Sequence, residues 1–158
     1  MNNNLFKPNY LQTLCRECGL DPSKKYGQNY LITDAPVKKM IQASEINRED
    51  TVIEIGPGFG ILTLALTEKA GKVIAFEIEK KLENYWVENK TENLEIIYGN
   101  VLNKIRDTTN KIQNYKVVAN LPYQITSNIF RTLLELENPP ESYKYYIGLE
   151  KMEKGLGI

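Results

Sequence analysis

Residues 51–60, "TVIEIGPGFG", join a short run rich in β-branched residues to a loop with glycine at positions 56, 58 and 60. β-branched residues favour a strand, and glycines permit the tight turn by which a strand passes into a helix. Residues 60–70 follow with apolar side chains at helical spacing. The stretch therefore predicts a strand–turn–helix unit, the building block of an α/β fold.

The same alternation of strand and helix extends along the chain. Strands are expected at 51–56, 72–78, 94–99, 115–120 and 143–149. Helices are expected at 9–19, from Asp34 as N-cap through Ile46, at 60–70, at 79–90 and at 126–136, with a weak helical turn at 101–112. Five such units predict a parallel sheet covered by helices on both faces, and right-handed crossovers give the strand order 3-2-1-4-5.

Composition indicates one soluble domain. The chain has 158 residues, of which 42% are hydrophobic and 25% are charged, and its 20 basic and 20 acidic residues cancel. Basic residues outnumber acidic ones in residues 1–48 and 101–158, so a polyanion would meet these parts. No apolar run approaches the length of a membrane span, and the polar start lacks the apolar core of a secretory signal. We expect a cytoplasmic protein with no membrane contact.

The cysteines and the absence of histidine bear on the chemistry. Cys15 and Cys18 form a C-x-x-C pair, but there is no second pair and no histidine to complete a metal site. Two reduced thiols one helical turn apart are the favoured reading, and no metal is expected. Without histidine, hydrolysis by a Ser–His or Cys–His arrangement is excluded.

The ends of the first two strands indicate an adenosyl ligand. In a parallel sheet, ligands bind beyond the carboxyl ends of the strands. The dinucleotide fingerprint would require glycine at position 61, where this chain has Ile61, so the loop disfavours a pyrophosphate. Glu77 ends the second strand, where a carboxylate can accept both hydroxyl protons of a ribose. The alternatives are a simple strand-to-helix turn and a solvated carboxylate.

The fourth strand ends in an unusual corner. Residues 116–128, "KVVANLPYQITSN", pass from a buried strand into Asn120-Leu121-Pro122-Tyr123. An amide, a proline and an aromatic residue at this rim suggest that a ligand is held there, although an ordinary proline turn with a surface tyrosine is the alternative.

Four stretches of the chain together resemble one family, the S-adenosylmethionine-dependent rRNA adenine N6,N6-dimethyltransferases of the small ribosomal subunit. They are "KKYGQNYL" at 24–31, "VIEIGPGFGILT" at 52–63, "VIAFEIEKKL" at 73–82 and "VVANLPYQITSNI" at 117–129. The resemblance covers about residues 10–150. It implies the α/β Rossmann-like sheet of class I methyltransferases and the cofactor S-adenosyl-L-methionine.

The resemblance also implies roles for individual residues. Those implied to bind the cofactor are Asn29, Leu31, Gly56, Gly58, Glu77, Asn100 and Asn120. Those implied to act in catalysis are Asn120, Leu121, Pro122 and Tyr123. An adenine N6 is a poor nucleophile because its lone pair is delocalised. The Asn120 side-chain oxygen and the Leu121 carbonyl would accept hydrogen bonds from the N6 amino group. Pro122 would fix the bend, and Tyr123 would stack on a flipped base.

Two departures from the family pattern qualify these expectations. Asn100 stands where the family usually has Asp, so a weaker bond to the cofactor adenine is expected. The pattern also stops after the fifth strand. We expect residues 1–150 to form an incomplete catalytic domain that lacks the carboxyl-terminal helical domain, and residues 151–158 to be an unstructured tail.

The function expected from the resemblance is dimethylation of adenines in small-subunit rRNA. The partner would be this RNA or the immature small ribosomal subunit, and the protein would act as a monomer. The alternative is a truncated or decayed copy that binds cofactor or RNA without catalysis.

Overall fold

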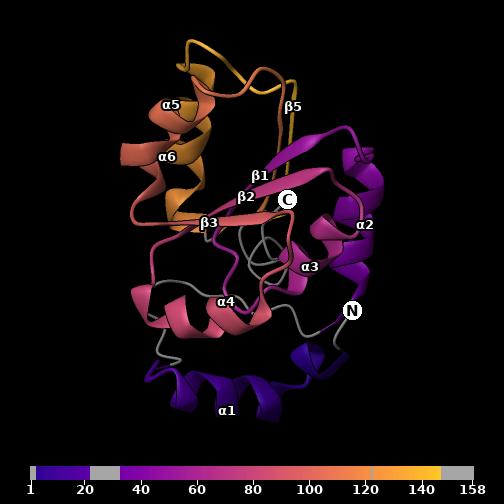
Figure 1. Cartoon of the computed structure of the whole chain (residues 1–158), viewed down its shortest axis with the longest axis vertical. Helices are drawn as coiled ribbons and strands as arrows, with labels where there is room; N and C mark the ends of the chain where they lie inside the picture. Colours follow the sequence, from indigo (N-terminus) through magenta and orange to yellow (C-terminus); the bar gives the residue numbers. More distant parts are fainter. Residues whose placement is uncertain (1–2, 22–32, 122, 147–158) are drawn as a thin grey trace, which may run out of the picture.

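The computed structural model describes residues 3–21, 33–121 and 123–146, which form five strands and six α-helices among these ranges (Figure 1). The strands are β1 (Thr51–Ile55), β2 (Lys72–Glu77), β3 (Leu94–Tyr98), β4 (Lys116–Asn120) and β5 (Ser142–Tyr146). The helices are α1 (Pro8–Glu17), α2 (Ala35–Ser44), α3 (Ile61–Thr67), α4 (Glu83–Asn89), α5 (Val101–Thr109) and α6 (Tyr123–Leu134). Two short 3-10 turns, η1 (Asn3–Phe6) and η3 (Lys80–Leu82), precede α1 and α4.

The five strands form one parallel sheet in the order β3-β2-β1-β4-β5, which confirms the predicted order. Ile55 at the end of β1 stands opposite Phe76 of β2 and Ala119 of β4. The carboxyl ends of these three strands therefore lie along one rim. The glycine loop and Asn120 share this rim, as the sequence predicted.

Helices cover both faces of the sheet, again as predicted. Figure 1 shows α5 and α6 on one side of the sheet and α2 and α3 on the other, with α1 beyond α4. Side chains alternate along β1, because Val52 belongs to the core under α2 and α3 whereas Ile53 and Ile55 belong to the core under α5 and α6. Both cores are almost wholly apolar, so burial on two faces explains the near-continuous hydrophobic character of the strands.

The element boundaries differ from the prediction in several places. The weak turn expected at 101–112 is a regular helix, α5, whose Val101, Ile105 and Thr109 are buried at a spacing of four residues. Helix α6 begins at Tyr123, three residues earlier than expected, so it starts directly at the predicted catalytic corner. The helix expected at 79–90 is divided into η3 and α4.

The starts of α2 and β5 also differ from the prediction in detail. Asp34 occupies the N-cap position of α2 but its side chain makes no capping hydrogen bond, and it pairs instead with Lys38 one turn along. The last strand begins at Ser142, one residue before the predicted start, and residues 147–149 of that prediction lie outside the described residues, as does the predicted tail 151–158.

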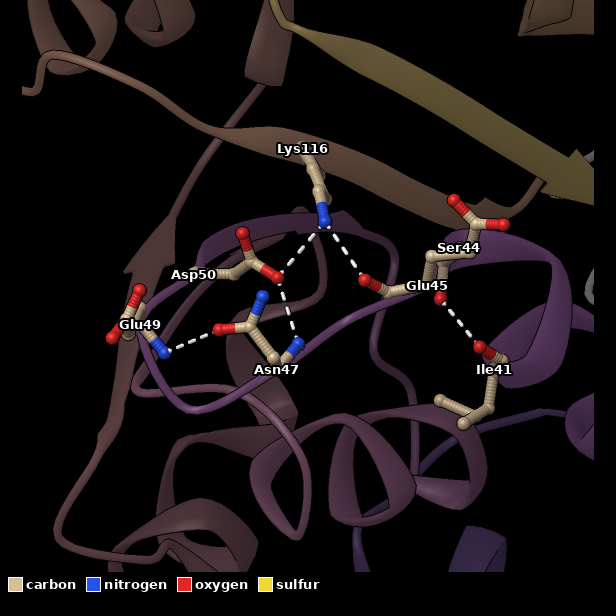
Figure 2. Close-up of polar contacts among 7 residues, drawn as sticks. All are labelled: Ile41, Ser44, Glu45, Asn47, Glu49, Asp50 and Lys116. Atoms are coloured by element: carbon tan, nitrogen blue, oxygen red, sulfur yellow. Dashed lines mark hydrogen bonds and ion pairs between the residues drawn. The ribbon is translucent and has the colours of Figure 1, made fainter.

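A polar network closes the opposite rim, at the amino ends of β1 and β4 (Figure 2). The Lys116 ammonium donates to the Glu45 carbonyl and to Asp50 Oδ2, both at 2.9 Å. Asp50 also accepts from the Asn47 N–H at 2.7 Å. Burial acts to raise the pKa of Asp50, but the Asn47 N–H and the Lys116 charge outweigh it and hold the pKa below its usual value. The network fixes the loop that leads from α2 into β1.

Candidate active site

The glycine loop after β1 has a backbone that favours glycine at three positions. Gly56, Gly58 and Gly60 have φ values of 75°, 55° and 87°, in the left-handed region. Among the described residues, nothing lies within 4 Å of a Cβ built at Gly56 or Gly58. A Cβ at Gly60 would approach Trp86 Cη2 to 2.7 Å. The loop is therefore packed against α4 at its far end, while its first two glycines leave space beside the backbone.

Glu77 connects the end of β2 to this loop. Its side chain is buried, and Oε2 accepts from the Gly58 N–H at 3.0 Å while Oε1 accepts from the Glu79 N–H at 2.8 Å. Burial raises the pKa of Glu77, and the backbone N–H groups oppose that shift. Each carboxylate oxygen can accept a further hydrogen bond. Glu77 thus has the capacity to bind two hydroxyl groups while it holds the loop.

Three buried side-chain oxygens near this rim have no hydrogen-bond partner among the described residues. They are Glu54 Oε2, Thr63 Oγ1 and Tyr98 OH. Burial raises the pKa of Glu54 to about 8; the nearby Thr63 hydroxyl opposes the shift without a regular hydrogen bond, and the Glu77 charge adds to it. Burial likewise raises the pKa of Tyr98 to about 12, with Glu77 adding to the effect. Unsatisfied buried polar atoms are rare, so each of these oxygens retains the capacity to form a hydrogen bond.

The burial of Glu54 was not predicted from the sequence. A signal was present, because Glu54 is the charged residue within the run "VIEI" of an otherwise apolar strand. Carboxylates are almost never fully buried unless they are paired. With 1% exposure, Glu54 lies in the interior, close to Thr63 and within reach of the Glu77 charge.

Asn100 has a structural role that the sequence analysis did not predict. Its Oδ1 accepts from the Leu102 N–H at 3.0 Å and so caps α5. The amide oxygen has a second lone pair, so capping leaves it able to accept a bond from a ligand.

Two exposed apolar side chains flank the ends of β2 and β3. Ile78 follows Glu77 directly and is 59% exposed, and Leu102 follows Asn100 by two residues and is 38% exposed. Single exposed apolar residues are common on protein surfaces. Here each lies within two residues of a predicted ligand-binding residue, so both are available to contact an apolar part of a ligand. The position of Ile78 within the acidic stretch "EIEKK" was an available signal.

The structure places part of the predicted catalytic corner. Asn120 ends β4 at the same rim as the glycine loop, half-buried and in register with Tyr146 of β5. The Leu121 side chain is buried in the core beneath α6. Tyr123 is the first residue of α6, but its side chain lies outside the described part, as do Pro122 and the predicted cofactor residues Asn29 and Leu31.

The remaining expectations concern metals and membranes. Cys15 is buried in α1 and Cys18 is the C-cap residue that follows this helix, and no disulfide joins the two. Within residues 3–21, 33–121 and 123–146, no three Cys, Asp or Glu side chains gather closely enough to hold a metal ion. None of the helices in these ranges has the length and hydrophobicity that crossing a lipid bilayer requires.

The sequence was compared with protein families and with curated proteins. A family model described as ribosomal RNA adenine dimethylase matches residues 20–153. A ribosomal RNA small subunit methyltransferase A of Ureaplasma parvum is 40% identical over 130 residues, which cover 77% of this chain and 47% of the relative. The protein of that name from Dehalococcoides mccartyi is 43% identical over 122 residues, which cover 75% of this chain and 42% of the relative. The chain thus spans less than half the length of these relatives.

Solved structures share the fold. A dimethyladenosine transferase from Plasmodium falciparum superimposes with a TM-score of 0.57 at 25% identity, covering 72% of this chain and 42% of that one. The 23S rRNA methyltransferase ErmE superimposes with a TM-score of 0.62 at 23% identity, covering 80% of this chain and 52% of that one. The five-stranded parallel sheet is therefore of the Rossmann-like methyltransferase type, as expected from the sequence.

Proposed function

The chain belongs to the ribosomal RNA adenine dimethylase family, and from this premise we propose that the protein methylates N6 of adenines in small-subunit ribosomal RNA. The observation that carries the proposal is the shared rim, along which Asn100, Glu77, the glycine loop and Asn120 follow one another at the ends of β3, β2, β1 and β4. The proposed methyl donor is S-adenosyl-L-methionine. Relatives named small subunit methyltransferase A support the reaction and the RNA.

The residues of the rim suit an adenosyl group without a diphosphate. Glu77 would accept from the ribose hydroxyls, and Asn100 Oδ1 from the adenine amino group. Ile78 and Leu102 would contact the faces of the adenine, since each is an exposed apolar side chain beside one of these polar residues. The open space beside Gly56 and Gly58 would admit the ligand close to the backbone. Asn29 and Leu31 are proposed as further contacts on the strength of the family resemblance.

The proposed chemistry needs no strong base. The cofactor supplies a methyl group that is electrophilic because it is bound to a sulfonium. Asn120 and the Leu121 carbonyl would accept hydrogen bonds from the two N6 N–H groups of the target adenine and so favour a nitrogen lone pair that is free to attack. Transfer of the methyl group would form the new N–C bond while the C–S bond leaves its electron pair on sulfur, and one N6 proton would be lost to solvent afterwards. Pro122 would fix the corner and Tyr123 would stack on the flipped base.

We further propose that the target is the RNA of the immature small subunit, met by a monomer in the cytoplasm. The flanking basic stretches of the sequence support an RNA partner. The second candidate is a protein that binds cofactor or RNA without catalysis. The two candidates differ only in turnover.

Two measurements test the proposal. Calorimetry on this chain should detect binding of S-adenosylhomocysteine but not of NAD, and Glu77→Gln should weaken that binding about tenfold or more, because one ribose bond loses its charged acceptor. Methyl transfer should then be assayed with a form extended by the second half of the relatives, on small-subunit particles that lack the modification. Binding without transfer by this extended form would favour the second candidate, and absence of binding would overturn both.

A further inference from the structure

Two neighbouring aromatic residues of α4 donate hydrogen bonds to backbone carbonyls of the glycine loop. The Trp86 indole N–H donates to the Gly58 carbonyl at 3.0 Å, and the Tyr85 hydroxyl donates to the Phe59 carbonyl at 2.9 Å. Glu77 accepts from the N–H of the same Gly58 at 3.0 Å. Gly58 is thus fixed through both its N–H and its carbonyl, by side chains from two different elements.

Packing reinforces these hydrogen bonds. Phe59 and Tyr85 meet edge to face with ring centroids 5.2 Å apart, and Trp86 is 2% exposed against the loop. The Trp86 ring also fills the space beside Gly60, where a Cβ would come within 2.7 Å of it. The aromatic pair therefore contacts three consecutive residues of the loop.

The direction of the Gly58 carbonyl determines which backbone groups of the loop face away from α4. The described peptide bonds are trans, so the N–H of Phe59 points opposite to the Gly58 carbonyl that Trp86 binds. Holding the carbonyls toward α4 turns the other side of these peptides away from the helix. Left-handed glycines have many alternative conformations, and without such contacts the loop would lose entropy when a ligand orders it.

We propose that Tyr85 and Trp86 are positioning residues that preorganise the glycine loop for the cofactor. The inference rests on the proposed function, because it concerns the adenosyl ligand of the same rim. Neither residue needs to contact the ligand. Each acts through a loop carbonyl, and the loop is already arranged when the ligand arrives.

The test compares variants that each remove one hydrogen-bond donor. Trp86→Phe and Tyr85→Phe keep an aromatic ring and lose the donor to Gly58 or Phe59. The matched control is Tyr115→Phe, because the buried Tyr115 hydroxyl also donates to a backbone carbonyl, that of Asn138 at 2.7 Å, but in the other core. Thermal unfolding should show that all three variants fold, with Tyr85→Phe and Tyr115→Phe losing similar stability.

Affinity for S-adenosylhomocysteine, measured by calorimetry, separates positioning from general stability. We expect Kd to rise about 3- to 10-fold in Tyr85→Phe and Trp86→Phe and to stay unchanged in Tyr115→Phe. Trp86 is the single tryptophan of the chain, so its fluorescence reports on the loop directly. In the parent and in Tyr85→Phe, emission should change on titration with the ligand, at the Kd that calorimetry gives.

The failures are distinguishable. If the parent binds the ligand and both α4 variants bind it equally well, the positioning role is overturned while the proposed function stands. Equal losses of affinity in all three variants would likewise overturn it, because they would reflect stability alone. If the folded parent does not bind S-adenosylhomocysteine, the proposed function fails and the positioning role fails with it.

Discussion

At the scale of single residues, Asn100 combines two tasks at a position where, by the family resemblance, Asp is usual. Its oxygen caps α5 through the Leu102 N–H, and the same oxygen is proposed to accept from the cofactor adenine. An amide serves as an N-cap about as well as a carboxylate, whereas a charged acceptor forms the stronger ligand bond. The substitution found in this chain should therefore reduce cofactor affinity more than it reduces stability.

Asn100→Asp tests this division. The variant should bind S-adenosylhomocysteine more tightly by about 1 kcal/mol, roughly fivefold in Kd, because a charged acceptor replaces a neutral one. The free energy of unfolding should change by less than about 0.5 kcal/mol, since both side chains cap helices well. Calorimetry and urea unfolding measure the two quantities. Unchanged affinity would show that residue 100 does not contact the ligand.

Glu54 should make stability depend on pH. Its folded-state pKa of about 8 lies above the ordinary 4.5, so the folded protein holds a proton that the unfolded chain releases. Stability from this group is present below pH 4.5 and is lost as pH rises toward 8. In the Glu54→Gln variant the side chain cannot titrate. The free energy of unfolding of this variant, relative to that of the parent, should therefore increase from pH 5 to 8 by on the order of 1 kcal/mol per pH unit.

Urea unfolding of the parent and Glu54→Gln at pH 5, 6.5 and 8 measures this effect. The difference between the two proteins removes the contributions of groups that both retain. A difference that is constant across this range would contradict the raised pKa of Glu54.

At the scale of elements, the two rims of the sheet have different tasks. Among the described residues, the carboxyl rim carries buried oxygens without partners, whereas at the amino rim Lys116 and Asp50 are paired and have only 15% side-chain exposure each. The amino rim is therefore expected to serve stability alone.

Asp50→Asn should lower the free energy of unfolding by about 1–3 kcal/mol, because it leaves a largely buried ammonium without its counter-charge. The pKa of Asp50 is depressed, so this stability is present above pH 3.8 and is lost as pH falls through the lower folded-state value. Affinity for S-adenosylhomocysteine should not change. The matched control is Glu95→Gln, which breaks the half-exposed pair with Lys72 and should cost less than about 1 kcal/mol.

Thermal and urea unfolding of the two variants give the comparison. If Asp50→Asn costs no more than Glu95→Gln, the network at the amino rim has no special role in stability.

Element type was predictable where hydrophobic spacing was strong, as in β1, β2 and α3. The sequence signal for the α5 helix was weak, because its buried face consists of only Val101, Ile105 and Thr109 and threonine does not count as apolar in a hydrophobic pattern. The start of α6 at Tyr123 was not predicted because Ile125 in its first turn is exposed and the polar residues around it show no helical period. In both places tertiary packing decided the boundary.

At the scale of the whole molecule, the topology was predictable because right-handed crossovers leave few arrangements for five alternating units. The same rule brought the ends of β1, β2 and β4 together, so the rim with Gly58, Glu77 and Asn120 followed from the sequence. The contacts of Trp86 and Tyr85 with the loop did not follow, since their spacing in α4 indicates only a helix face. Side chains that act through a backbone carbonyl leave no local pattern in the sequence.

The central claim is that Asn120 at this rim activates an adenine N6 beside bound cofactor. Its most direct test is transfer of radiolabelled methyl groups to unmodified small-subunit particles by the extended form and its Asn120→Ala variant, with S-adenosylhomocysteine affinity measured on the same preparations. The account predicts that transfer falls about 10²–10³-fold while Kd changes by less than about threefold, because the Asn120 bond strengthens as the nitrogen gains positive charge. An Asn120→Ala enzyme that dimethylates at the parental rate would contradict it.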